Sequence, residues 1–442
     1  MAADRAFPWA RHLSHGPGAQ QGQVLVLGML LAAVLALAWL RYFAVGQVIA
    51  GKARLVHGLD AAAYSGALVQ ARTLNFLAYV NRAQLAHQIA MAHLVTLGSW
   101  AHFGGTQADR LLQANPPAHL IGMLFGADHG RAYLAASEAV GLAAHAGPDG
   151  GPGRAWAAHD AFVHGHLRDL SRALVRSLPQ AREAAMQAVL SSHYPERPAA
   201  PFDLHVKDDG WSRLVRTHRP DAALFEFVRR LADFYPYLGP RNRTVGNTWA
   251  VDPRCPGLRH ELRRRGATDL DANGRWQSGD TQSFHALRSN RWMGCYYREY
   301  PMGWAWIPAQ GGAVAPGDYT DEPPENFSEQ DFWRWVRAAT QWDLLDGQAN
   351  PLGNSYAVRD QPAWASTGLA AYEEVAPGGT DDAASGFVVT LTLLGPEGGI
   401  LHARSAAESH FVRPSRRPDG LREVPNLFHP YWHARLAAGL AP

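Results

Sequence analysis

A long uncharged stretch near the N-terminus constrains this chain more than any other feature. From Gln20 to Arg41 the sequence reads QQGQVLVLGMLLAAVLALAWLR, and the 17 residues from Val24 to Leu40 carry no charge. A helix that crosses a bilayer needs about 20 apolar residues, and an arginine at its end can reach the headgroups. The stretch therefore predicts a transmembrane anchor over residues 23–44, preceded by a short tail, residues 1–22.

A cleaved export signal is the main alternative, because Ala44 and Gly46 are small residues of the kind found before a cleavage site. Signal peptides have an apolar region of about 7–15 residues behind a short basic tail. In this chain the tail is longer and the apolar region is at the upper limit, so we expect the anchor to be retained. Positive charges stand on both sides of the anchor, so their count sets no orientation.

The helix of the anchor can continue beyond the membrane, because no proline occurs between Pro17 and Pro116. Residues 45–103 are expected to be helical, either as one helix with the anchor or as a second helix joined near Gly46 and Gly51. An apolar stripe at steps of three and four supports this: Leu74, Leu77, Asn81, Leu85, Ile89 and Ala92. The asparagine in this stripe is either a hydrogen-bonded core residue or a polar residue that sets the register between packed helices.

The remaining sequence changes character twice. HFGGTQ and QANPPAH end the first helical region, and residues 104–234 are expected to be mainly helical. Residues 235–442 are expected to form a mixed α/β, tryptophan-rich domain, with GFVVTLTLL, residues 386–394, as its clearest strand. The expected fold class is therefore α+β: a long N-terminal helix, a helical region and a mixed, strand-containing C-terminal domain.

Charge and cysteine content limit the classes of function. The net charge of +2 is too small to support a nucleic-acid partner. Cys255 and Cys295 are too few for a disulfide-dense scaffold or a four-cysteine zinc site. In an exported domain a disulfide between them would contribute on the order of 4 kcal/mol through loop closure, whereas in the cytosol both would stay reduced.

The segment DLDANGRWQSGD, residues 269–280, resembles the start of a calcium-binding loop. Asp269, Asp271, Asn273 and Gly274 occupy positions 1, 3, 5 and 6, but position 12 is an aspartate where a bidentate glutamate is usual. An Asn-Gly pair between two strand-like segments is also a strong signal for a type I′ hairpin turn. We favour the hairpin.

Three other clusters have a chemical and a structural interpretation, and the structural one is favoured in each. His159, His164 and His166 lie beside Asp160, but their spacings do not suit a zinc site on a helix. The acidic residues between Asp318 and Asp331 could be paired carboxylates, but they also fit a solvated loop before a capped helix. The aromatic band could stack on sugars or form core: Trp292, Tyr296, Tyr297, Tyr300, Trp304 and Trp306.

No catalytic residue, cofactor or metal ligand is therefore assigned. The chain contains no nucleophile-elbow, P-loop, dinucleotide-binding or metal-protease motif, and this lowers the expectation of an enzyme.

Several segments resemble the TadE/TadG-like proteins of tight-adherence (Flp) pilus assembly. They are GQVLVL at the start of the anchor, LDAAAYSGA at residues 59–67, the Asn-Arg-Ala segment RTLNFLAYVNRAQLAHQIAMAH, and the end of the chain around EVPNLFHPYWHARLA. The chain is much longer than the small processed members of this group, and it lacks a glutamate soon after a cleavable glycine. It is therefore more similar to the unprocessed, TadG-like branch.

This resemblance implies a single-pass protein of the bacterial inner membrane, with its N-terminus in the cytoplasm and most of the chain in the periplasm. The implied role is that of a minor pilin-like or assembly component, non-enzymatic, whose partners are other pilus-assembly membrane proteins and pilin-like subunits. The residues proposed for helix packing or assembly are Asp60, Ala63, Gly66, Asn75, Asn81 and Arg82. The alternatives are a membrane-tethered envelope hydrolase and an adhesin-like carbohydrate-binding module.

Overall fold

The computed structural model describes residues 21–197, 200–290, 294–307, 364–376 and 385–437. Helices dominate the first half of the chain. They are α1 (Gln21–Leu112), α2 (Ala118–Phe125), α3 (Ala127–Leu134), the 3-10 helix η1 (Ala135–Ala139), α4 (Leu142–His145), α5 (Gly151–Ala161), the π-helix η2 (Phe162–Leu167), α6 (Arg168–His193), α7 (Trp211–Leu214) and α8 (Ala222–Ala232).

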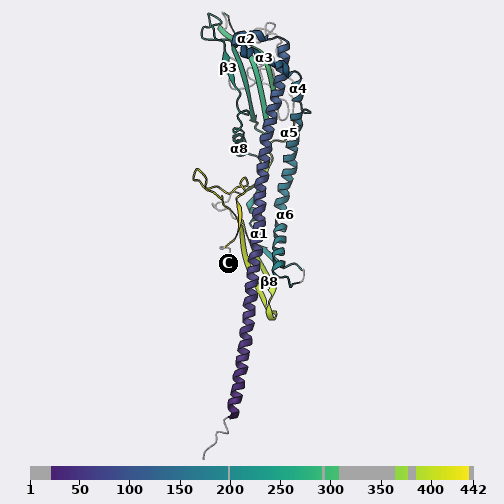
Figure 1. Ribbon diagram of the computed structural model, residues 1–442, viewed down its shortest axis with the longest axis vertical. Helices are drawn as coiled ribbons and strands as arrows, with labels where there is room; N and C mark the ends of the chain where they lie inside the picture. The colour runs from purple at the N-terminus through teal and green to yellow at the C-terminus, as the bar shows by residue number, and fades with distance from the viewer. Residues whose placement is uncertain (1–20, 198–199, 291–293, 308–363, 377–384, 438–442) are drawn as a thin grey trace, which may run out of the picture.

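Helix α1 is the axis of the molecule. It is a single helix of 92 residues, with no break at Gly46 or Gly51, and at 1.5 Å per residue it is about 140 Å long. Figure 1 shows it running from one end of the molecule to the other. Its N-terminal part projects free of the body, and its C-terminal part carries the remaining elements on its sides.

The helix extends further than the sequence indicates. The break expected after residue 103 at Gly104 and Gly105 does not occur, and α1 continues to Leu112. Both glycines face the segment around α4, where an added Cβ at Gly105 would lie 2.6 Å from the Cβ of Ala143. The glycines therefore allow a close approach between two helices instead of ending the first one.

All the described strands pair antiparallel, in three sheets. The first sheet has the order β1 (Leu204–Lys207), β8 (Ser385–Leu394), β9 (Ile400–Phe411), β10 (Trp432–Leu436). The second joins β2 (Val215–His218) to β7 (Tyr372–Val375), and the third has the order β3 (Arg243–Gly246), β4 (Glu261–Leu270), β5 (Trp276–Asn290), β6 (Gly294–Ile307). A 3-10 turn, η5 (Pro396–Gly398), lies between β8 and β9. The predicted α+β fold class is thus confirmed.

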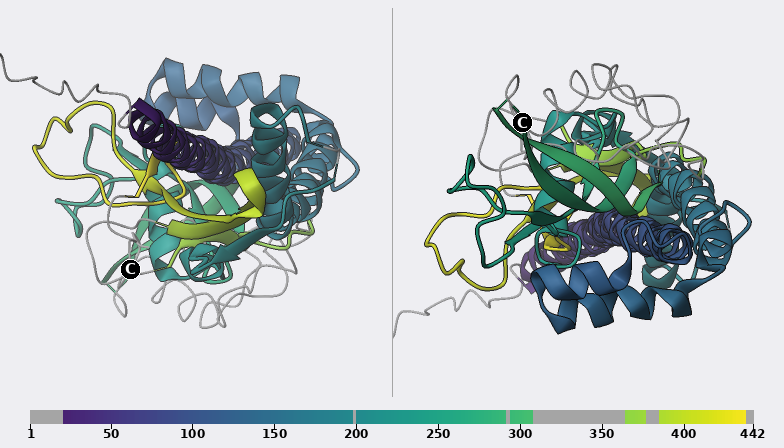
Figure 2. Two further views of the ribbon diagram at one scale, coloured as in Figure 1. Left: turned by 90° about the horizontal axis from the view of Figure 1, so that it is seen from below. Right: turned by 90° about the horizontal axis from the view of Figure 1, so that it is seen from above.

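The sheets lie at different heights along α1 and link distant parts of the chain. The sheet β3–β6 lies at the end of the molecule far from the N-terminus, and the sheet containing β8 lies near the point where the body begins (Figure 1). The views along the long axis in Figure 2 show strands of both sheets beside α1. Residues 104–234 are mainly helical, as expected, and their two short strands, β1 and β2, pair with β8 and β7. Strand pairing thus joins the regions on the two sides of residue 235.

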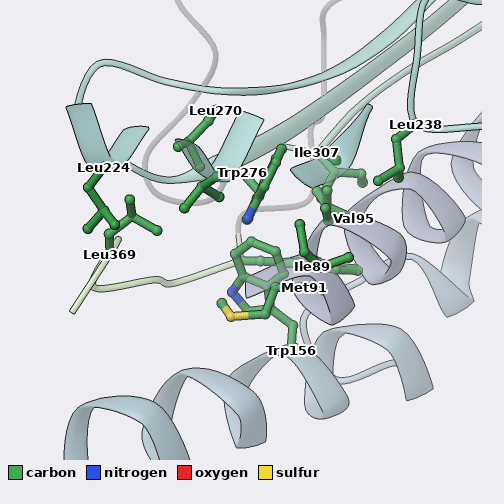
Figure 3. Packing of buried hydrophobic residues seen from close by; sticks show 14 of the residues in the cluster. Ile89, Met91, Val95, Trp156, Leu224, Leu238, Leu270, Trp276, Ile307 and Leu369 are labelled. Atoms are coloured by element: carbon green, nitrogen blue, oxygen red, sulfur yellow. The ribbon is translucent and has the colours of Figure 1, made fainter. Parts of the chain in front are cut away.

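One core cluster forms where α1, α5, α8 and the sheet β3–β6 meet (Figure 3). Ile89, Met91 and Val95 of α1 pack there against Trp156 of α5 and Trp276 of β5. A second cluster joins the start of the body, from Leu55 to Ala67 on α1, to α6, β8 and β9. The predicted stripe on α1 is confirmed, because its members are buried or partly buried in these clusters and their neighbours.

The predicted hairpin over residues 269–280 is present, but its turn differs from the prediction. Leu270 pairs with Trp276, so the loop has five residues instead of the two of a type I′ turn. The carboxylate of Asp271 accepts hydrogen bonds from the backbone N–H of Asn273 and of Arg275, each at 2.8 Å, and only Gly274 has a positive φ, +73°. The aspartate side chain therefore selects a longer loop than the Asn-Gly pair alone would favour.

The same hairpin contains the most completely buried carboxylate of the third sheet. Asp280 has no exposed surface, and it accepts hydrogen bonds from Arg241 at 3.0 Å, from Arg264 at 2.7 Å and from the hydroxyl of Ser99 on α1 at 2.7 Å. Two guanidinium groups and a hydroxyl thus compensate the loss of water around this charge. The cluster attaches the sheet β3–β6 to α1.

We expect Asp280→Asn to destabilise the protein by about 3–5 kcal/mol, because it leaves two arginines without their buried counter-charge. Denaturant unfolding, followed by circular dichroism, measures this loss. The matched control is Asp269→Asn in the same hairpin, where an exposed ion pair with Arg229 contributes about 0–1 kcal/mol. Equal effects of the two substitutions would contradict the assigned role of the Asp280 cluster.

Candidate functional surface

The free part of α1 is the first feature of the surface that calls for a function. Nearly every residue from Gln23 to Ala50 is exposed. Among the described residues, α1 is the one helix that is both long enough and apolar enough to cross a membrane. None of its most apolar window is buried. Contact with the body begins at Gly51, beside Leu401, and Leu55 is already fully buried. The anchor predicted over residues 23–44 thus lies on the exposed part of α1, just before the body.

The small residues after the anchor face the inside of the protein. Ala63 is fully buried, and an added Cβ at Gly66 would lie 3.0 Å from the ring of Phe387 on β8. Asp60 accepts a hydrogen bond of 2.6 Å from the hydroxyl of Ser405 on β9. These three positions therefore bring the first sheet close to α1, and they do not form a surface for another chain.

Two asparagines of α1 bind backbone far away in sequence. The side-chain amide of Asn75 donates to the carbonyl of Trp432 and accepts from its N–H, each at 2.9 Å. It thus pairs with the backbone of β10 as a neighbouring strand would. Asn81 donates at 2.7 Å to the carbonyls of Glu373 and of Leu427. Asn81 is therefore a core residue that connects α1 to β7 and to the loop before β10, and it does not set the register between two helices.

Arg82 differs from the other five proposed packing residues, because it is exposed. It lies at one end of a groove of about 780 Å³ on the side of α1. One wall of the groove is formed by α8 and the residues after it, including Phe234, and the other by the loop from Phe428 to Tyr431. His93 lies further along α1 in the same groove, between the rings of Tyr235 and Tyr237.

Burial lowers the pKa of His93 below its usual value. Its ring is therefore neutral at pH 7. Its Nε2 atom is shielded from solvent and makes no hydrogen bond to a described residue. The groove thus combines aromatic walls, one exposed guanidinium and one imidazole nitrogen with free hydrogen-bonding capacity.

The other predicted clusters have structural partners. Asp160 accepts hydrogen bonds from Thr367 and Ser366, and His164 lies 3.0 Å from the carbonyl of Gly368. His159 contacts His87, with their Nδ1 atoms 2.7 Å apart. His166 packs edge-on against the ring of Phe162. No group of three or more His, Cys, Asp or Glu side chains among the described residues could hold a metal ion.

The carboxylates of the calcium-like loop are also paired. Asp269 binds an exposed arginine at 3.2 Å, Asp271 binds a partly buried one at 2.9 Å, and Asp280 binds the two partly buried arginines described above. In the aromatic band, Tyr297 is buried and Arg110 lies over the ring of Trp304, 5.1 Å from its centre. Tyr300 is partly buried and stacks on Phe284.

Trp306 is partly buried and packs against Gly279 of the neighbouring strand. Trp292, the side chain of Tyr296 and the acidic residues 318–331 lie outside the described residues. Cys255 and Cys295 form a disulfide that connects the loop after β3 to the start of β6.

One further group, which the sequence did not indicate, lies beside Asn81. Glu373 is buried and forms an ion pair of 2.7 Å with Arg168. Its neighbour Glu374 accepts hydrogen bonds from the N–H groups of Val375 and Leu427, at 2.7 Å and 2.8 Å, and forms no ion pair with a described residue. Burial raises the pKa of Glu374 to about 7. The sequence shows only two consecutive glutamates, and nothing in it predicts that one is ion-paired while the other has a raised pKa.

Comparison with known proteins adds no relative: no family model, curated protein or solved structure matches the chain.

The raised pKa of Glu374 predicts a pH-dependent stability. Because the folded chain holds this proton more tightly than the unfolded chain, whose glutamate has a pKa near 4.5, stability should fall as the pH rises from about 4.5 to about 7. Glu374→Gln keeps the acceptor oxygen and removes the charge. We expect the unfolding free energy of the variant to exceed that of the parent protein by about 3 kcal/mol at pH 8 and to match it near pH 4.5.

Denaturant unfolding of both proteins at a series of pH values measures this difference, and titration of other groups cancels in the comparison. Glu373→Gln is the control, because it leaves Arg168 buried without its partner and should be destabilising at pH 8. A constant difference between parent and Glu374→Gln across the pH range would contradict the assignment.

Proposed function

We propose that this protein is a membrane-anchored, non-enzymatic component of a tight-adherence type pilus system. The observation that carries the proposal is α1: its apolar first part is fully exposed, and its continuation is the axis on which the body folds. A helix that both crosses the membrane and organises the exported domain suits a protein that presents its body at a fixed position above the bilayer. The resemblance of both ends of the chain to TadE/TadG-like proteins supports the same role.

The proposed arrangement places the N-terminus in the cytoplasm and the body in the periplasm of the bacterial inner membrane. The disulfide between Cys255 and Cys295 favours this orientation, because disulfides persist in oxidising compartments such as the periplasm. The partners proposed are pilin-like subunits and other assembly proteins of the same membrane. Tyr297 is buried and Arg110 covers the ring of the partly buried Trp304, so these two residues give no support to a sugar-binding face built on the aromatic band.

Protease treatment of spheroplasts tests the orientation. With a tag on the N-terminus, we expect the full-length protein to be reduced to a short tagged fragment, because the anchor and tail are protected while the body is accessible. Protection of the full-length protein would place the body in the cytoplasm and end the proposal. Release of the tag before protease is added would show a cleaved leader.

Thiol labelling gives an independent test of the compartment. Protein from growing cells, denatured in acid and treated with a maleimide-polyethylene glycol reagent, should show no mass shift unless it is first reduced, after which both cysteines react. Labelling of both cysteines without reduction would mean that the body folds in a reducing compartment.

Deletion of the gene tests the assembly role directly. We expect cells to keep making the pilin subunit but to lose surface filaments, and expression of the intact chain to restore them. A chain without residues 1–44, exported by a cleaved signal, should fail to restore filaments although its body folds. Normal filaments in the deletion strain would overturn the proposal.

A further inference from the structure

Between Tyr64 and Trp100, the described residues leave much of one face of α1 exposed. Its residues recur at steps of three and four, which places them on one side of the helix, and all are exposed or partly exposed. They are Tyr64, Leu68, Arg72, Phe76, Tyr79, Arg82, Ala86, Ala90, His93, Leu97 and Trp100, called here the open face of α1. Large apolar side chains dominate it: the exposed fraction is 56% for Tyr79 and 48% for Phe76.

The groove described above forms the central part of this face. The aromatic side chains of α8, its following loop and the loop before β10 form its walls, and its floor is formed by α1 through Arg82, Leu85, Ala86, Ile89, Ala90 and His93. Ala86 and Ala90 are the small residues of this floor. Small residues between large ones let a second helix approach the first closely.

The charge of the open face restricts the occupant. Between Ala61 and Ala108 the helix contains no aspartate or glutamate, and Arg72 and Arg82 are the charged residues of the open face. Neither arginine forms an ion pair with a described residue, and both are exposed. Two copies of this chain that met through this face would bring arginine against arginine, which disfavours a homodimer.

We propose that the open face binds a helix of a second, different membrane-anchored chain, running parallel to α1. The helix would place two carboxylates about ten residues apart, opposite Arg72 and Arg82, because these arginines are separated by about 15 Å along the axis. Apolar side chains between the carboxylates would fill the groove. This inference rests on the proposed function only in that α1 leaves the membrane as a continuous helix.

Photo-crosslinking in the cells that normally make the protein tests this proposal. The full-length chain carries Tyr79→p-benzoylphenylalanine on the open face. The matched control is Leu170→p-benzoylphenylalanine, at an exposed position of α6. We expect irradiation to give one adduct from position 79, absent from position 170. Mass spectrometry should map the adduct to a helix that directly follows a transmembrane segment and carries acidic residues.

Charge reversal separates this docking mode from chance contact. Arg72→Glu with Arg82→Glu should lower the adduct yield about tenfold, and Arg72→Lys with Arg82→Lys should largely preserve it. Intact disulfide and unchanged circular dichroism show that each variant is folded. An adduct between two differently tagged copies of this chain, an adduct insensitive to charge reversal, a mapped peptide without carboxylates, or no adduct from a folded protein would each overturn the inference.

Failure here is distinguishable from failure of the proposed function. A cytoplasmic body in the spheroplast experiment ends the pilus proposal but leaves the open face to be cross-linked in the cytoplasm. Conversely, a periplasmic body without a charge-dependent adduct leaves the pilus proposal standing and removes this partner.

Discussion

The fold depends on α1, a single helix whose exposed first part is long and apolar enough to cross a membrane and whose remainder carries the body. A segment inside a bilayer satisfies its backbone hydrogen bonds internally, so it must be helical. In this chain α1 continues beyond the predicted span for more than half of its length and supplies residues to three core clusters of the described residues. Since the body is built on the helix that is proposed to cross the membrane, a tilt of the anchor would tilt the body with it.

Apolar contacts alone would not fix the position of the sheets along such a helix. The buried side of α1 is rich in alanine and leucine, and apolar packing has little directional preference. Hydrogen bonds are directional, and α1 makes them at separate heights: Asp60 to β9, Asn75 to β10, and Asn81 to β7. Ser99, further along, binds Asp280 of the third sheet. These polar side chains determine which turn of α1 each returning strand meets.

Local sequence predicts the elements of this protein better than their partners. The uncharged stretch and the stripe from Leu74 to Ala92 predict α1, because helical periodicity is a local property. The pairing of β1 with β8 joins residues nearly two hundred positions apart, and no periodicity encodes it. The residues around Asp60 and Asn81 were predicted to contact a partner chain. Small and polar residues on a helix suit packing within its own domain as well as packing against another chain, so the sequence cannot distinguish the two. At residues 271–275 the side chain of one aspartate outweighed the Asn-Gly signal.

What the body leaves uncovered on α1 is as specific as what it buries. Its buried sides carry aliphatic and polar residues that contact the chain's own strands, whereas the open face carries aromatic side chains and two arginines. A rigid helix holds Arg72 and Arg82 about 40 Å and about 55 Å beyond the end of the predicted span. A partner has to present its carboxylates at those same heights. A second helix that leaves the same membrane is already held parallel to α1, so its residues have fixed heights above the bilayer. A soluble protein would have to reach both arginines by diffusion alone.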